Sequence, residues 1–238
     1  KNQLFGIAIT ELTFLLSRRS LYCTKTANGK YSICNEFDTE NGNILFDKIQ
    51  HTWKNGKCEF CRANQGVYDR DEILDTHAYH FIHIEKAQEI FKMKFDVIVG
   101  NPPYQLSDGG AGASAIPLYH KFVKQAKKLN PQYISMIIPS RWFAGGRGLS
   151  KFRLEMQEDK RLKAMVDYPK SRDCFPGVDI AGGVCYFLWD KAHKGQCNFI
   201  SRINKRESRS LRYLDEFVFV IRDNIGIDII HKVMSIEE

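Results

Sequence analysis

The sequence lacks the features of membrane-embedded and exported proteins. None of its apolar runs approaches the about 20 residues that a membrane-spanning helix needs, and no signal peptide opens the chain. Internal repeats and low-complexity tracts are also absent. With 43% hydrophobic and 26% charged residues over 238 positions, we expect a cytoplasmic, globular chain with one sizeable α/β domain, or one domain with an insertion.

The sequence has fewer acidic than basic residues: 28 Asp and Glu against 35 Lys and Arg, which gives a formal net charge of +7. A basic excess favours a polyanionic partner such as nucleic acid, although charge alone does not identify one. The chain also begins with Lys1 rather than Met. We therefore expect it to be processed or to be part of a longer protein.

The amino-terminal segment has the pattern of a strand followed by a helix. Residues 3–9 predict a short buried strand, and residues 11–22 predict an apolar-periodic helix in which Leu12, Leu15 and Leu16 share one face. A strand followed by a helix is the repeating unit of a doubly wound α/β sheet. After this unit the pattern becomes irregular up to about residue 89, with one further short strand at 43–46.

The α/β alternation returns in the second half. Strands are predicted at 95–100 (buried), 133–139, 162–168 and 183–190, and helices at 117–128 and 150–159. The last two strands lack a helix between them, which predicts an antiparallel edge. A basic stretch at 201–212, a strand-like segment at 217–221 and the start of a helix follow. The pattern predicts an α/β sheet that is mostly parallel.

The tetrapeptide Asn101-Pro102-Pro103-Tyr104 follows the predicted strand 95–100 directly, where open α/β sheets place their ligands. The two prolines remove backbone donors, so this loop offers acceptors. The Asn101 side-chain oxygen and the Pro102 carbonyl can both accept from one planar amine, which makes its nitrogen lone pair nucleophilic. Tyr104 can stack on the ring that bears the amine. The bare tetrapeptide also fits a rigid turn, but this position favours a catalytic site.

The run FDVIVGNPPY resembles the catalytic motif of amino-methyltransferases that use S-adenosylmethionine. The wider run, through Ser140-Arg-Trp-Phe to CFPGVDIAGGVCYFLWD, resembles the N6-adenine DNA methyltransferases of bacterial type II restriction–modification systems, in particular those that share a chain with an endonuclease. The resemblance covers most of residues 1–190. It implies a Rossmann-like methyltransferase sheet, S-adenosylmethionine as cosubstrate and double-stranded DNA as substrate.

The resemblance also assigns roles to individual residues. Asn101, Pro102 and Tyr104 match the residues that hold a flipped adenine, and Phe175 matches the aromatic residue on the other face of that base. A core phenylalanine near a strand start would fit Phe175 equally well. Arg147, in a Gly-rich loop beside the DNA, is a candidate phosphate contact or a solvated loop charge.

The cofactor positions depart from the family pattern. Asn43, followed by Ile44, stands where the family usually has an acidic residue that contacts the cofactor adenine. Ala8 stands where an acidic residue usually binds the ribose hydroxyls. Glu11, one turn later, is the candidate to replace it, although a solvated charge at a helix start has the same pattern.

Two parts of the family pattern have no counterpart in the sequence. The first strand with its Gly-rich cofactor loop is expected upstream of Lys1, and a target-recognition domain is expected downstream of Glu238. We therefore expect a fragment of a larger methyltransferase, with weak or no cofactor binding and no activity by itself. The predicted divisions are a strand–helix of the core (1–22), a Cys-rich insertion (23–90), the catalytic core (91–200), and a basic linker with the start of a following domain (201–238).

Seven cysteines are present, and four of them crowd into residues 23–61. Cys58 and Cys61 have the two-residue spacing of zinc knuckles, whereas Cys23 and Cys34 are more widely spaced. Four thiolates could close a structural zinc site, and ordinary buried or free thiols are the alternative. Three histidines in a strand-like segment are predicted to be surface or structural residues rather than ligands: His77, His80 and His83.

The basic stretch near the carboxyl end allows two interpretations. Its cations are Arg202, Lys205, Arg206, Arg209 and Arg212. They could line DNA phosphates on the way to a recognition domain, but a solvated linker has the same composition and is slightly favoured.

Three functions fit the sequence. The leading one is the catalytic portion of a DNA adenine methyltransferase. A protein-glutamine methyltransferase would use the same tetrapeptide on a peptide substrate, and the basic balance, the long insertion and the Cys-Phe-Pro segment favour DNA over it. The third is a zinc-bearing nucleic-acid-binding module with an inert methyltransferase-like body.

Overall fold

The computed structural model describes residues 1, 3–68, 78–90, 93–106, 116–204 and 206–236. By its contacts the chain divides into two compact units, residues 1–85 and 86–238. Across the described residues, no helix combines the length and apolar character that crossing a membrane requires.

The first unit is built from very short elements. They are β1 (Gly6–Ile7), α1 (Glu11–Tyr22), β2 (Ile44–Leu45), β3 (Lys48–Ile49), β4 (Trp53–Lys54), β5 (Lys57–Cys58), α2 (Gln65–Tyr68), β6 (Ala78–Tyr79) and the 3-10 turn η1 (His80–Ile82). The helix predicted at 11–22 is confirmed. The strand predicted over 3–9 shrinks to two residues, because β1 pairs in parallel with β2, which is itself only two residues long.

Helix α1 does not bury the face that its sequence pattern indicates. It begins after Thr10, whose hydroxyl accepts a hydrogen bond from the backbone N–H of Thr13. Its buried residues are Phe14 and Tyr22, and the Phe14 ring stacks on Phe46 with centroids 5.7 Å apart. The leucines of the predicted apolar face are exposed: Leu12, Leu15 and Leu16.

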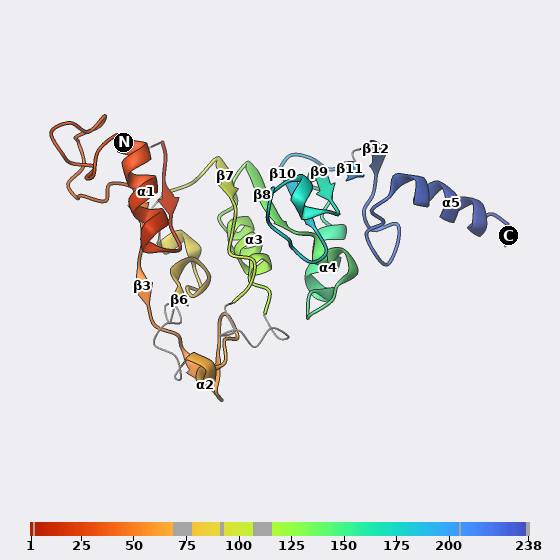
Figure 1. Ribbon diagram of the computed structural model, residues 1–238, viewed down its shortest axis with the longest axis horizontal. Coiled ribbons are helices and arrows are strands. Elements are labelled where there is room, and N and C mark those ends of the chain that lie inside the picture. Colours follow the sequence, from red (N-terminus) through yellow and green to blue (C-terminus); the bar gives the residue numbers. More distant parts are fainter. Residues whose placement is uncertain (2, 69–77, 91–92, 107–115, 205, 237–238) are drawn as a thin grey trace. The chain divides into compact units, whose positions relative to one another are not determined.

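The second unit contains a six-stranded sheet in the order β12-β11-β9-β10-β8-β7 (Figure 1). Its elements are η2 (Ala87–Glu89), β7 (Val97–Gly100), α3 (Tyr119–Lys128), β8 (Tyr133–Pro139), η3 (Ser140–Ala144), α4 (Ser150–Gln157), β9 (Leu162–Tyr168), η4 (Ser171–Asp173), β10 (Val184–Asp190), β11 (Cys197–Ile203), β12 (Arg206–Arg212) and α5 (Asn224–Met234). The strands predicted at 133–139 and 162–168 are confirmed at these bounds, and the one at 183–190 to within one residue.

The strand directions confirm a sheet with both parallel and antiparallel strands, but the antiparallel strand β10 lies at a different place from the predicted one. β7 and β8 pair in parallel, as do β9 and β11, whereas β10 is antiparallel to both β8 and β9. β10 therefore lies inside the sheet, and the prediction that the β9–β10 pair forms its edge is wrong. The reason is that β11 and β12 continue the sheet beyond β9, with the antiparallel β12 at the edge.

Three other expectations for this unit are corrected. The strand at 95–100 was expected to be buried, but Val97 and Val99 are 53% and 77% exposed. They share one face of β7, an edge strand paired only with β8 among the described strands, whereas Ile98 on the other face packs against the core. The segment 201–212, expected as a basic linker, instead forms the end of β11 and all of β12. The strand-like segment 217–221 forms no strand.

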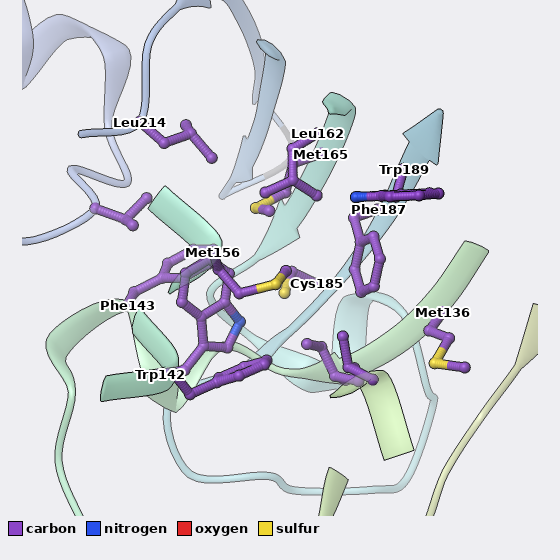
Figure 2. Packing of buried hydrophobic residues seen from close by; sticks show 14 of the residues in the cluster. Met136, Trp142, Phe143, Met156, Leu162, Met165, Cys185, Phe187, Trp189 and Leu214 are labelled. Carbon is purple, nitrogen blue, oxygen red and sulfur yellow. The ribbon is translucent and has the colours of Figure 1, made fainter. Parts of the chain in front are cut away.

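The two faces of the sheet have different coverings. Alternate residues of β8 and β10, such as Ile138 and Phe187, join one large apolar cluster with α3, α4 and η3. Figure 2 shows Trp142, Phe143 and Met156 within this cluster. The opposite face carries a smaller cluster around Val166, Tyr168 and Val184, against which loop residues rather than helices pack. The predicted catalytic loop contributes to this second face.

Candidate active site

The predicted catalytic tetrapeptide, Asn101–Tyr104, leaves the sheet at the carboxyl end of β7, directly after Gly100. Asn101 is exposed, Pro102 is buried, and Pro103 and Tyr104 are half-buried. The Tyr104 carbonyl accepts a hydrogen bond of 3.0 Å from the Leu118 N–H just before α3, which fixes the far end of the loop. The loop therefore presents an exposed amide on a backbone that two prolines make rigid.

Tyr104 and Phe175, which the resemblance placed on opposite faces of one base, pack against the same apolar cluster. Burial is the main cause that raises the pKa of the Tyr104 phenol to about 12, followed by the neighbouring Cys174 and Cys185 thiols. The phenol therefore stays neutral near pH 7. It can stack or donate a hydrogen bond, but it cannot act as a base.

The loop that carries Phe175 is held together by one buried serine, Ser171. Its hydroxyl donates to the Val178 carbonyl at 3.0 Å and accepts from the Ile180 N–H at 2.8 Å. Its carbonyl accepts from the Phe175 N–H at 2.7 Å. Ser171 therefore sets the position of Phe175 through the backbone on both sides of it.

Replacing Ser171 with alanine should lower the free energy of unfolding by about 1–3 kcal/mol, because the part-buried N–H of Ile180 and carbonyl of Val178 each lose their hydrogen-bond partner. The measurement is urea unfolding followed by tryptophan fluorescence. Ser150→Ala is the matched control, since its exposed hydroxyl makes one bond to the Gly145 carbonyl, and we expect a change of at most about 0.5 kcal/mol. Equal effects of the two substitutions would contradict the role assigned to Ser171.

A buried ion pair that the sequence pattern did not predict lies near the same end of the sheet. Asp167 is fully buried, and both of its carboxylate oxygens accept from Arg222, at 2.7 and 2.8 Å. Ser140 also donates to it at 2.8 Å, and Arg222 donates to the Gly182 carbonyl at 2.7 Å. Burial raises the pKa of Asp167, and the hydrogen bonds oppose this shift. The network joins the ends of β8 and β9 to the segment before α5.

Arg147 lies between η3 and α4, in the Gly-rich loop that the sequence predicts. It is exposed, and its backbone adopts a left-handed conformation with φ of 55°. A DNA-phosphate contact by this residue stays a prediction.

The cofactor candidates all lie in the first unit. Glu11 follows the carboxyl end of β1 and lies 3.9 Å from the Lys48 ammonium. Asn43 precedes β2, so it lies at the other end of the parallel β1–β2 pair, where its amide donates to the Leu4 carbonyl at 3.0 Å. Ile44 is buried. The structure does not bring Glu11 and Asn43 to one end of this strand pair, and their cofactor roles stay predictions.

The cysteines group differently from the prediction. Cys58 and Cys61 are fully buried, and their sulfurs converge with ring nitrogens of His51 and His83 rather than with other thiols. Cys23 and Cys34 are outside this group, so the structure does not bring the four predicted thiols together. Cys23 ends α1 in a left-handed, exposed conformation.

The histidines of the strand-like segment differ in their surroundings. His83 belongs to the group whose geometry could hold a metal ion, whereas His80 pairs with Asp47 at 2.9 Å. His77 lies outside the described residues. Alternation along a strand-like segment did not distinguish these histidines, and the sequence prediction did not include His51, seven positions before Cys58.

The basic residues near the carboxyl end are largely engaged within the chain. Arg202 donates to the Tyr168 hydroxyl at 2.8 Å and pairs with Glu207, which also pairs with Arg209. Arg212 is buried and donates to the Ile221 carbonyl. Lys205 lies outside the described residues. These pairings argue against a continuous basic track along β12.

Comparison with known proteins shows a family and a similar curated protein. Residues 2–175 match the family described as Eco57I restriction-modification methylase. A protein of Mycoplasma pneumoniae (strain ATCC 29342 / M129 / Subtype 1), described as an uncharacterized adenine-specific methylase, is 36% identical over 229 residues, which cover 85% of this chain and 54% of that protein. The chain thus spans about half the length of this curated relative.

Solved structures show weaker similarity. The type I restriction-modification methyltransferase subunit from Streptococcus thermophilus is 14% identical, with 61% of this chain and 32% of that chain covered and a TM-score of 0.35. A modification subunit of a putative type I restriction enzyme from Vibrio vulnificus YJ016 is 16% identical, with 48% and 27% covered and a TM-score of 0.34.

Proposed function

Because the chain belongs to the Eco57I restriction-modification methylase family, we propose that it is the catalytic portion of a DNA adenine-N6 methyltransferase. The observation that carries this proposal is the loop Asn101–Tyr104 at the carboxyl end of β7. Tyr104 from this loop and Phe175 from a distant segment pack on the same apolar cluster. Two aromatic side chains beside an exposed amide suit a flat base that bears an exocyclic amine.

In this proposal the chain positions the amine and leaves it uncharged. A flipped adenine stacks on Tyr104 and Phe175, while its N6 hydrogens are accepted by the Asn101 Oδ1 and the Pro102 carbonyl. The N6 lone pair then forms a bond to the methyl carbon of S-adenosylmethionine as the carbon–sulfur bond breaks, and the surplus N6 proton passes to solvent. The acceptors stabilise the positive charge that develops on N6.

We further propose that the cosubstrate site needs a segment of chain upstream of Lys1. Glu11, Asn43 and Ile44 are our candidates for its adenosine part. Among the described strands, β7 pairs only with β8, and its other edge is where the predicted upstream strand of a Rossmann-like sheet would pair. The partners are then this upstream segment, a downstream recognition domain and double-stranded DNA, and the chain alone is expected to be inactive.

The test is transfer of labelled methyl from S-adenosylmethionine to mixed-sequence duplex DNA, by this chain and by a version extended upstream. We expect N6-methyladenine, identified by mass spectrometry of the digested DNA, from the extended version only. Methylation of glutamine in peptides in preference to DNA would replace the substrate assignment. An extended protein that binds DNA and S-adenosylmethionine but methylates neither DNA nor peptides would overturn the proposed activity.

A further inference from the structure

Four metal-binding side chains converge in the first unit of the chain, in the part that includes β3, α2 and β6 (Figure 1). They are His51, Cys58, Cys61 and His83, and each offers a ligand atom within 4.8 Å of the other three. No carboxylate belongs to the group. Two sulfurs and two imidazole nitrogens form the donor set of tetrahedral zinc sites, whereas Mg²⁺ and Ca²⁺ prefer oxygen.

The backbone folds tightly around the two sulfurs. The β4–β5 hairpin leads to Cys58, whose N–H donates to the Ala63 carbonyl at 2.9 Å, while its carbonyl accepts from the Arg62 N–H at 3.0 Å. Arg62 has a φ of 68°, so the chain reverses direction just after Cys61. The Ala63 N–H then points at the Cys61 sulfur, 3.4 Å away. A backbone donor in this position can hydrogen-bond to a metal-bound sulfur and so hold its orientation.

The two imidazoles are oriented so that each can direct a ring nitrogen toward the same point as the sulfurs. The Nδ1 of His83 lies 2.8 Å from the Tyr79 carbonyl, which can only accept, so the ring proton is on Nδ1 and Nε2 carries the lone pair. The Nδ1 of His51 lies 3.4 Å from the Cys61 sulfur. Tetrahedral zinc, with bonds of about 2.3 Å to sulfur and about 2.0 Å to nitrogen, separates two such ligands by about 3.5 Å.

Aromatic rings surround the histidines. The Trp53 and Tyr68 rings lie 4.8 and 5.1 Å from the His51 ring, and Phe60 lies 5.6 Å from His83. Such a shell restricts both the rotation of the imidazoles and the access of water. It suits a closed structural site better than a catalytic one, which keeps an open position.

We propose that His51, Cys58, Cys61 and His83 bind one structural Zn²⁺. Two thiolates, two neutral imidazoles and Zn²⁺ sum to zero charge, which permits the full burial of both cysteines. The ion ties the β4–β5 hairpin to the segment after β6. Cross-linking of this kind matters here because the strands of this unit are only two residues long.

The test uses the full chain, purified under reducing conditions and loaded with ZnCl₂, followed by elemental analysis. We expect one zinc per chain, and loss of at least tenfold in zinc affinity for Cys58→Ser and for His83→Ala. Cys34→Ser and His80→Ala are the matched controls and should keep the zinc. A chain that takes up no zinc, retains it in Cys58→Ser or loses it in Cys34→Ser would overturn the proposal.

A second measurement needs no substitution, so it stands even if a variant fails to fold. X-ray absorption at the zinc edge of the loaded, unaltered chain should show two sulfurs at about 2.3 Å and two nitrogens at about 2.0 Å. A shell of four sulfurs, or of oxygen and nitrogen alone, would refute this ligand set. Neither measurement involves methyl transfer, so the outcome is independent of the proposed function.

Discussion

Replacing Asn101 with alanine is expected to lower kcat for methyl transfer to adenine by about 10²–10³-fold, which is typical for the loss of one oriented polar group at the reacting centre. The side-chain oxygen of Asn101 is exposed at the carboxyl end of β7 and is our candidate acceptor for one N6 hydrogen. Steady-state kinetics of the active, extended protein measure the effect. KM for DNA should change far less than kcat, because stacking on Tyr104 and Phe175 remains.

Two further variants make this prediction specific. Asn101→Asp keeps an acceptor at the same place and should lose less activity than Asn101→Ala. Gln105→Ala alters another exposed side chain of the same loop and should leave kcat within about twofold, since the predicted mechanism gives it no role. If Gln105→Ala were as impaired as Asn101→Ala, the loss would reflect loop disruption rather than amine binding.

Replacing Arg222 with alanine is expected to lower the free energy of unfolding by about 3–5 kcal/mol, because it leaves the buried carboxylate of Asp167 without its counter-charge. Arg222 supplies two of the three side-chain hydrogen bonds to this carboxylate. Urea unfolding at pH 7 is the measurement. Arg172→Ala is the control, since both members of the Arg172–Asp179 pair are more than two-thirds exposed, and such surface pairs contribute at most about 1 kcal/mol.

The Arg222→Ala variant should also gain a pH dependence of known sign. Burial already raises the pKa of Asp167, and loss of Arg222 removes the main opposing interaction. The folded variant then binds a proton that the unfolded chain releases at its ordinary pKa, so its stability falls as the pH rises above that value. The deficit should therefore be smaller at pH 5 than at pH 8. A deficit independent of pH would show that the lost stability comes from packing around Arg222.

Local sequence patterns predicted several elements of this protein and the place of the loop Asn101–Tyr104 after a strand. α1 begins and ends where its periodicity predicts, and the strands at 133–139 and 162–168 match β8 and β9. Asn55 and Gly56, a dipeptide that favours tight turns, form a hairpin turn with positive φ at both residues. The run that ends in Asn101–Tyr104 resembles the methyltransferase family to which the comparisons assign the chain. These features depend on neighbours in sequence, so sequence alone contains them.

Only the tertiary structure decided which distant residues meet. Periodicity shows that a helix has an apolar face or that a strand is apolar, but burial depends on what packs against it, and so Leu12 and Val99 are exposed. Asp167 and Arg222 look like ordinary surface charges until β9 and the segment before α5 come together. His51 and His83 join Cys58 and Cys61 because backbone folding brings separate segments to one point. Thiol spacing alone could not select those partners, since a metal site is defined by convergence in space.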